Sequence, residues 1–89
     1  MPQNKIPSTA VEMTNRFFEA VDDLIRTKKI RGLGTLSRLW GVSRFVLTTV
    51  RSNSEKKRMD VEWINYIARD FGVSVTWIVS GQGKMYSRK

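Results

Sequence analysis

The sequence contains no cysteine and no histidine, and these two absences exclude much chemistry. Without cysteine there is no disulfide scaffold, no thiolate zinc site and no cysteine nucleophile. Without histidine the chain lacks the side chain most used for proton transfer and metal ligation near neutral pH. We therefore expect a binding protein rather than an enzyme, with no cofactor, no metal ion and no small-molecule substrate.

Paired carboxylates are the remaining candidates for acid–base or metal chemistry, namely Asp22 with Asp23 and Glu62 with Asp70. Each pair falls on a predicted exposed helix face and has no histidine to work with. We interpret both pairs as surface charge. The 89 residues make one domain and leave no room for a separate catalytic domain.

Long apolar runs are also missing. Residues 1–8 form a predicted flexible arm without the apolar stretch of a secretory signal, and no segment approaches the roughly 20 apolar residues of a membrane span. We expect a soluble, cytoplasmic protein that does not bind membranes. A basic amphipathic membrane-surface helix is the competing explanation for the positive charge, but the bases are spread over three predicted helices and two loops.

The positive charge is concentrated in the middle of the chain. The net charge is +8, yet residues 26–58 hold ten basic side chains against one acid, Glu55. The ten are Arg26, Lys28, Lys29, Arg31, Arg38, Arg44, Arg51, Lys56, Lys57 and Arg58. A polyanion is the partner that best suits such a segment.

Apolar spacing and capping residues predict two helices in the first half of the chain. The first begins between Thr9, which forms a capping box with Glu12, and Thr14, and it ends at Gly32 or slightly earlier. Its inward stripe is Phe17, Val21, Leu24 and Ile25. The second helix covers residues 35–40 and is followed by Gly41.

Three further helices are predicted after a Gly-Val-Ser turn. Ser43 caps a helix over residues 44–51, with Val46, Leu47 and Val50 facing inward; its β-branched residues leave a strand as the local alternative. Asp60 caps a helix over 61–71 that ends at Gly72, and Ser74 caps one over 75–79 that ends at Gly81. The inward face of 61–71 is Val61, Ile64, Ile67, Ala68 and Phe71, with Trp63 beside it. The chain is thus predicted as all-α, with a domain over 9–81 and a loosely held tail over 82–89.

Two motifs in this order carry a family resemblance. They are Gly41-Val42-Ser43 and the stretch from Phe71 to Gly81, Phe-Gly-Val-Ser-Val-Thr-Trp-Ile-Val-Ser-Gly, which continues from that last glycine as Gly81-Gln82-Gly83-Lys84-Met85. The chain resembles the lambda-repressor-like (Cro/C1-type, Xre-like) helix-turn-helix family of bacterial and phage regulators. The resemblance implies a five-helix domain with a helix-turn-helix between Leu33 and Ser52. It further implies binding to double-stranded DNA, transcription regulation as a repressor, and a homodimer on a two-fold operator.

The sequence departs from that family at the positions that read DNA. Leu33 stands where the family commonly has Gln at the start of the second helix, and Arg44 and Phe45 stand where Gln or Ser is usual. The loop after residue 51 is longer and more basic. The base preference of this chain is therefore its own.

The candidate site residues follow from the helix-turn-helix prediction. The base-contacting set is Arg44, Phe45, Thr48 and Thr49, since an arginine fork can reach guanine O6 and N7 and threonine can reach bases by hydroxyl or methyl. Phe45 has two readings, packing on thymine methyls or completing the core against Trp40. The phosphate-contacting set is Thr35, Arg38, Arg51, Asn53, Ser54, Lys56, Lys57 and Arg58.

Aromatic residues in the second half are interpreted as core or self-association contacts and not as stacking platforms for bases; these are Trp63, Tyr66 and Trp77. The predicted dimer interface is Trp77, Ile78 and Met85, with a stable monomer left open. Two other partners also stay open. The same fold serves as a protein-interaction or antitoxin-like module, and a basic surface also suits RNA.

Overall fold

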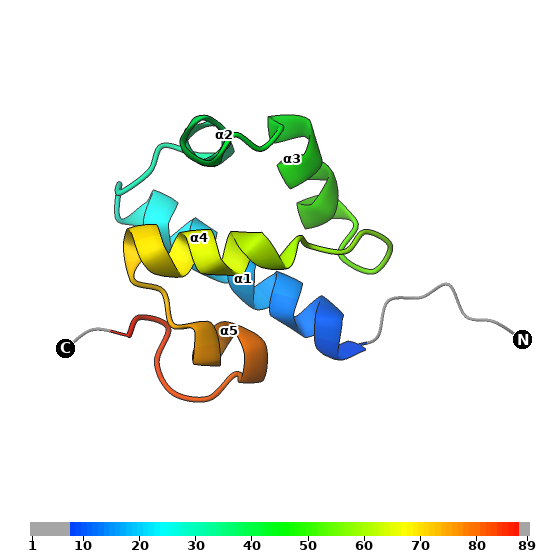
Figure 1. The fold of residues 1–89 in the computed structure, drawn as a ribbon, viewed down its shortest axis with the longest axis vertical. Coiled ribbons are helices and arrows are strands. Elements are labelled where there is room, and N and C mark those ends of the chain that lie inside the picture. Colours follow the sequence, from blue (N-terminus) through cyan, green and yellow to red (C-terminus); the bar gives the residue numbers. More distant parts are fainter. Residues whose placement is uncertain (1–7, 88–89) are drawn as a thin grey trace, which may run out of the picture.

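Five helices make up the regular structure of residues 8–87, the part of the chain that the computed structural model describes (Figure 1). They are α1 (Ser8–Arg26), α2 (Leu33–Trp40), α3 (Arg44–Ser52), α4 (Val61–Phe71) and α5 (Val75–Ser80). No β-strand lies in this stretch, so the predicted all-α class is confirmed and the strand alternative for 44–51 is wrong. None of these helices is long and apolar enough to cross a bilayer.

Short polar side chains begin three of the helices, as their sequence positions predict. Ser43 Oγ accepts the backbone N–H of Phe45 at 3.1 Å, and Asp60 Oδ1 accepts that of Glu62 at 3.0 Å. Ser74 Oγ accepts the N–H of Trp77 at 3.1 Å. Each cap satisfies a donor that the first turn of a helix leaves without an intrahelical partner, which fixes the starts of α3, α4 and α5.

Glycine ends α2, α4 and α5, again as predicted. Gly41, Gly72 and Gly81 have φ angles of 68°, 73° and 78°, the left-handed region that a side chain disfavours. At each position the glycine N–H bonds to a carbonyl of the last helical turn. A glycine therefore lets the chain turn sharply out of the helix.

The first helix, α1, differs from its prediction at both ends. Ser8, assigned to the arm, is the first residue of α1, and residues 1–7 of that arm lie outside the described part. α1 ends at Arg26, well before Gly32, because the Leu24 carbonyl accepts the N–H groups of Lys29 (2.9 Å) and Ile30 (3.3 Å). This turn buries Ile30, which is 4% exposed, and α2 then begins at Leu33.

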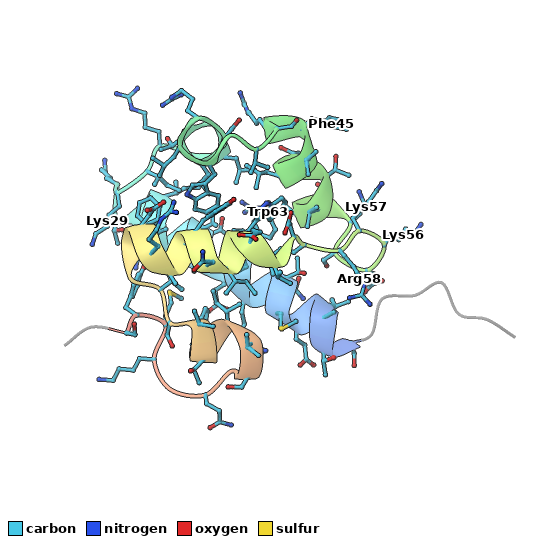
Figure 2. The ribbon with its side chains drawn as sticks, viewed as in Figure 1. Lys29, Phe45, Lys56, Lys57, Arg58 and Trp63 are labelled. Atoms are coloured by element: carbon cyan, nitrogen blue, oxygen red, sulfur yellow. The ribbon has the colours of Figure 1, made fainter. Side chains whose placement is uncertain are left out.

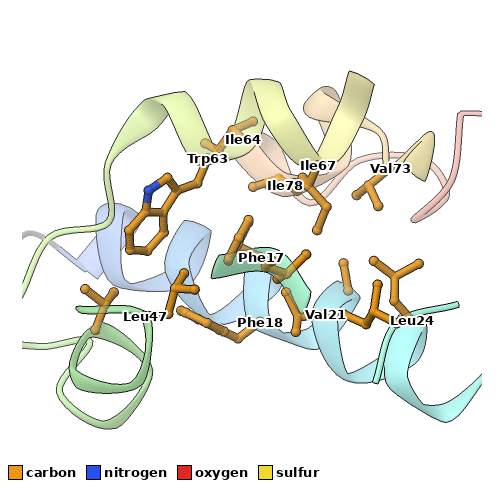
Figure 3. Packing of buried hydrophobic residues seen from close by; sticks show 14 residues of the cluster. Phe17, Phe18, Val21, Leu24, Leu47, Trp63, Ile64, Ile67, Val73 and Ile78 are labelled. Atoms are coloured by element: carbon orange, nitrogen blue, oxygen red, sulfur yellow. The ribbon is translucent and has the colours of Figure 1, made fainter. Parts of the chain in front are cut away.

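α1 lies at the centre of the core. Its residues Phe17, Val21 and Leu24 are completely buried, whereas Ile25, predicted on the same stripe, is half-buried. α3 and α5 both pack against α1, and α4 packs against α5. Figure 3 shows the α1 side chains facing apolar side chains from α3, α4 and α5. One continuous apolar cluster therefore fixes α3 relative to the rest of the chain.

Aromatic rings extend this core between α1, α2 and α4. Trp63 reaches from α4 toward α3 (Figure 2) and lies 5.9 Å, centroid to centroid, from Phe17. Tyr66 packs against Trp40 at 5.4 Å. Trp63 is 3% exposed and Tyr66 half-buried, so both rings contact the chain's own interior, as predicted for them. The Trp40 indole N–H also donates to Asp70 Oδ2 at 2.9 Å, which ties α2 to α4.

Two valines that the apolar pattern placed inward are exposed. Val46 is 42% exposed and Val61 is 71% exposed. In α3 the inward positions are Leu47 and Val50, and Val46 lies about a quarter-turn away from Leu47. Val61 is the first residue of α4, ahead of the turn in which Trp63 enters the core. That a residue is apolar does not by itself show whether neighbouring helices cover its side of a short helix.

The prediction of a loosely held tail is wrong for residues 85–87. Tyr86 forms an isolated antiparallel bridge with Val73, in which Ser74 N–H donates to the Met85 carbonyl at 2.7 Å. The Ser87 N–H donates to the Gly72 carbonyl at 2.9 Å. The tail is held because the segment between α4 and α5 offers backbone partners to it.

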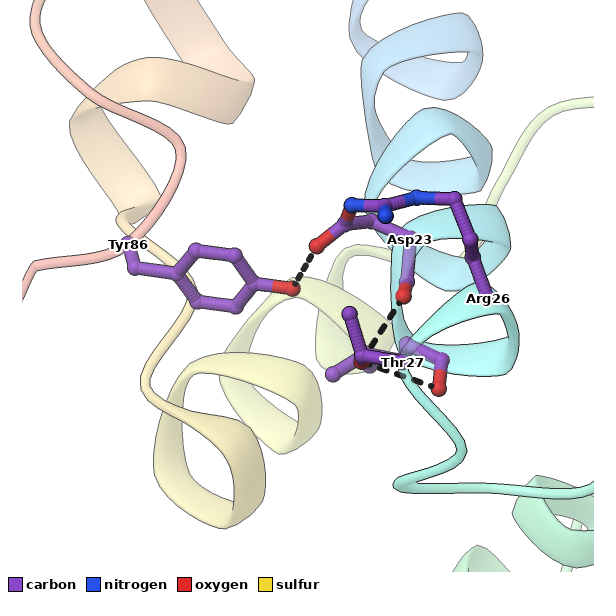
Figure 4. A network of polar contacts seen from close by, with 5 residues as sticks. Asp23, Arg26, Thr27 and Tyr86 are labelled. Atoms are coloured by element: carbon purple, nitrogen blue, oxygen red, sulfur yellow. Dashed lines mark hydrogen bonds and ion pairs between the residues drawn. The ribbon is translucent and has the colours of Figure 1, made fainter.

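A polar network at Asp23 joins this tail to α1 (Figure 4). The Tyr86 hydroxyl donates to Asp23 Oδ2 at 2.7 Å, and Arg26 pairs with the other carboxylate oxygen. The hydrogen bonds from Tyr86 and Arg26 hold the pKa of the Asp23 carboxyl below its usual value. Burial, and then the bond to Asp23, raise the pKa of Tyr86 to about 12.

Replacing Tyr86 by Phe should change how stability depends on alkaline pH. Because the ordinary phenol pKa is 10.0, the unfolded chain loses its proton first, so the Tyr86 contribution is complete below pH 10.0 and is lost as pH rises toward 12. We expect the free energy of unfolding, measured in urea at about pH 9 and about pH 11, to fall more in the wild type than in Tyr86→Phe. Tyr66→Phe is the control and should keep the wild-type fall. An equal fall in the free energy of unfolding for the wild type and Tyr86→Phe would contradict the hydrogen bond between Tyr86 and Asp23.

Candidate nucleic-acid interface

α3 is buried along one side and open along the other. Leu47 and Val50 are 0% and 3% exposed and fix the helix to the core. Arg44, Phe45 and Thr48 are exposed, and we call these three residues the outer face of α3. The Ser43 cap holds the first turn of this face in helical geometry. A short, capped helix therefore presents one basic, one aromatic and one hydroxyl side chain outward.

The structure excludes one of the two readings of Phe45, the core reading. Its side chain is 76% exposed and does not complete the core against Trp40. Thr49, predicted with it, is half-buried, and its hydroxyl donates to the Phe45 carbonyl at 2.8 Å. Of the four predicted base-contacting residues, Arg44, Phe45 and Thr48 thus share the outer face, whereas the Thr49 hydroxyl hydrogen is engaged within the helix.

The segment after α3 is a tight turn with projecting charges. We call residues 53–58 the basic loop. The Asn53 carbonyl accepts the N–H groups of both Lys56 and Lys57 at 2.8 Å, and Asn53 Nδ2 donates to the Thr49 carbonyl at 3.3 Å. Lys56, Lys57 and Arg58 are exposed, and Figure 2 shows Lys56 and Lys57 along the same edge of the molecule as Phe45.

The positive charges of the outer face and the basic loop have no ion-pair partner in the part of the chain that the structure describes. Within residues 8–87, no carboxylate oxygen lies within 4.0 Å of Arg44, Lys56, Lys57 or Arg58. Ser54, also predicted here, is half-buried in the turn. Unpaired, solvated cations on a surface attract anions without first having to break an ion pair.

A depression of about 280 Å³ lies beside the outer face. It is lined by the start of α2, by Thr35 and by three arginines, Arg31, Arg38 and Arg44. Thr35 Oγ1 accepts the Arg31 N–H at 3.2 Å, which holds the loop against the helix. The phosphate-contacting set predicted from the sequence includes Thr35 and Arg38 but not Arg31. Only its position in the basic segment of the sequence pointed to Arg31.

Arg51 does not share this surface chemistry. Its guanidinium lies 2.6 Å from Asp22 Oδ1 and 5.8 Å from the centre of the Phe18 ring. The predicted phosphate contact is thus engaged within the chain, where it ties the end of α3 to α1. No sequence spacing links Arg51 to Asp22, because the two helices meet only through the tertiary fold.

The basic segment of the sequence is not one patch in space. Lys29 lies at the opposite end of the molecule from Phe45, Lys56 and Lys57 in Figure 2. Arg26 is paired with Asp23 near that same end of α1. The charge that accompanies the outer face of α3 is therefore the basic loop together with Arg31, Arg38 and Arg44.

The residues predicted for self-association have different environments. Trp77 and Met85 are half-buried, whereas Ile78 is completely buried in the core of one chain and has no surface for a second copy. Arg16 of α1, which is half-buried, holds α5, since its Nε donates to the Ile78 carbonyl at 2.8 Å and its Nη2 to the Val79 carbonyl at 3.1 Å. Sequence reasoning did not foresee this use of Arg16.

No protein-family model, curated protein or solved structure matches this chain. In the described range there is also no group of three or more acidic side chains placed to hold a metal ion. The candidate site consists of the outer face of α3, the basic loop and the arginine-lined depression.

Proposed function

We propose that this protein binds double-stranded DNA by placing the outer face of α3 in the major groove. In this proposal α2, the turn at residues 41–43 and α3 act as a helix-turn-helix of the lambda-repressor-like type. The observation that carries it is the joint placement of an exposed, capped helix face and an unpaired basic loop on one edge of the molecule. That combination supplies one element to enter a groove and another to hold the flanking backbone.

The division of labour follows from the chemistry of each part. Lys56, Lys57 and Arg58 contact phosphates, because phosphate binding needs charge and little geometry. Arg38 and Thr35 contact the backbone at the other side of the groove, beside the depression. Arg44 then reaches base edges from the first turn of α3, where a guanidinium fork matches guanine O6 and N7.

B-form DNA is favoured over RNA by the shape of the reading element. The major groove of B-DNA admits an α-helix, while the major groove of A-form RNA is too narrow for side chains to read. Occupancy of a site by α3 excludes other proteins from the same DNA. We therefore propose a role as a transcriptional repressor of the bacterial or phage type, acting as a dimer on a two-fold site.

Exchange of Lys56 and Lys57 for alanine tests the backbone contacts. Each phosphate contact contributes about 0.9 to the slope of log K against log salt concentration, so the double variant should lower the magnitude of that slope by about 2 and weaken binding to all duplexes alike. Fluorescence anisotropy with labelled duplexes over a range of salt concentrations measures both effects.

The matched control is the Lys29→Ala, Lys84→Ala double variant, which removes the same charge away from the basic loop. It should leave the salt slope nearly unchanged. If both double variants change the slope equally, the charge acts without a defined site and the basic loop is not the anchor. Weak, salt-insensitive duplex binding by the wild type would contradict the proposal and favour the protein-interaction alternative.

A further inference from the structure

The outer face of α3 carries a large apolar side chain among its polar groups. Phe45 is 76% exposed, the highest fraction among the six large apolar side chains that are exposed within residues 8–87. No acidic residue occurs between Leu33 and Arg51. A ligand that covers this ring gains most from an apolar group of its own, because removing apolar surface from water is favourable.

Hydrogen bonds within the chain use part of the polar capacity of this surface. The Thr49 hydroxyl donates its hydrogen to the Phe45 carbonyl, which leaves its oxygen lone pairs and its methyl group for other contacts. Ser43 Oγ already accepts the N–H groups of Phe45 and Val46. The outer face offers the Arg44 fork and the Thr48 hydroxyl beside one large aromatic ring.

We infer that Phe45 is a specificity-determining residue that contacts the C5 methyl group of thymine, an inference that rests on the proposed function. The thymine methyl is the apolar group that the four standard bases present in the major groove. Phe45 lies in the first turn of α3, directly after Arg44 and the Ser43 cap, so it enters the groove with the arginine. Arg44 then selects a guanine and Phe45 a neighbouring thymine.

Thymine-to-deoxyuridine exchange isolates this contact, because it deletes the methyl and keeps every hydrogen-bonding group of the base. The duplex probe is the preferred site selected by the wild-type protein from a random pool, with each thymine replaced in turn. At one or two positions the exchange should weaken wild-type binding about fourfold, the factor expected for burying one methyl group. The Phe45→Ala variant should bind the two forms of the duplex equally.

Val61→Ala is the matched control, because Val61 is an apolar side chain of similar exposure on α4, away from the outer face. It should retain the wild-type discrimination between thymine and deoxyuridine. Because Phe45 is 76% exposed, Phe45→Ala should fold normally, and a thermal melt checks this.

The outcomes separate this inference from the proposed function. Tight, sequence-selective duplex binding with no effect of deoxyuridine at any position would overturn the role of Phe45 and leave the DNA-binding proposal standing. The same discrimination in Phe45→Ala as in the wild type would also overturn it, since another group would then contact the methyl. Absence of selective duplex binding would overturn the proposed function and the inference with it.

Discussion

Arg44→Ala should weaken binding to the preferred DNA site by about 1–3 kcal/mol, or roughly 5- to 150-fold, and relax the base preference at one position. The reason is geometric: a guanidinium in the first turn of α3 can make two parallel hydrogen bonds to one guanine, and alanine leaves that base edge without a partner. Competition between the preferred duplex and single-base variants measures the loss and its position together.

Two matched variants separate base reading from charge at this position. Arg44→Lys keeps the positive charge but not the planar fork, so it should recover part of the affinity and little of the discrimination. Arg38→Ala removes an equal charge from the same depression and should weaken all duplexes evenly. A uniform loss with Arg44→Ala, matching that of Arg38→Ala, would show that Arg44 contacts phosphate only.

The capped starts of α3, α4 and α5 and the glycine ends of α2, α4 and α5 were predictable from the sequence because their chemistry is local. A serine or aspartate before an apolar-periodic segment binds the N–H groups of the very next turn, as Ser43 and Asp60 do. A glycine after such a segment is the residue that adopts positive φ at no steric cost, as at Gly41 and Gly72. None of these interactions depends on what the rest of the chain does.

The features that sequence reasoning missed depend on which elements meet in space. Val61 is apolar and in phase with its helix, yet it is 71% exposed among the described residues. Tyr86 is held by Asp23, and Arg51 by Asp22, through pairs that are 63 and 29 residues apart. A pattern within one sequence gives residue types and spacing, but it does not give the partner of a long side chain.

The candidate site likewise has a part that follows from the local sequence and a part that depends on tertiary contacts. The outer face of α3 could be predicted, because it is the complement of the inward positions Leu47 and Val50. The assignment of individual cations could not, since Arg51 and Lys56 belong to the same basic segment, but within residues 8–87 Arg51 is paired with Asp22 and Lys56 has no carboxylate partner. Of the two adjacent carboxylates, Asp22 pairs with Arg51 of α3 and Asp23 accepts a hydrogen bond from Tyr86 of the C-terminal tail. α1 thereby holds both the proposed reading helix and the C-terminal segment.

Phe17→Ala should have the largest effect on stability, a loss of about 3–5 kcal/mol in the free energy of unfolding. Phe17 is completely buried at the centre of the core, and its ring lies 4.9 Å from that of Phe18 and 5.9 Å from that of Trp63. Alanine leaves a cavity that rigid neighbouring helices cannot close. Since domains of this size have total stabilities of roughly 5–15 kcal/mol, a substantial part of the folding free energy is lost.

Phe45→Ala is the matched control, because it deletes the same ring from a surface position and should change stability by less than about 0.5 kcal/mol. Urea unfolding followed by tryptophan fluorescence compares the two, and the midpoint should fall sharply for Phe17→Ala at an unchanged slope. The core, and not the intrinsic stability of a short helix, holds α3 in place. The Phe17→Ala variant should therefore unfold and lose DNA binding at urea concentrations at which the Phe45→Ala variant remains folded. Equal midpoints for the two variants would mean that Phe17 does not occupy the interior position that orients α3.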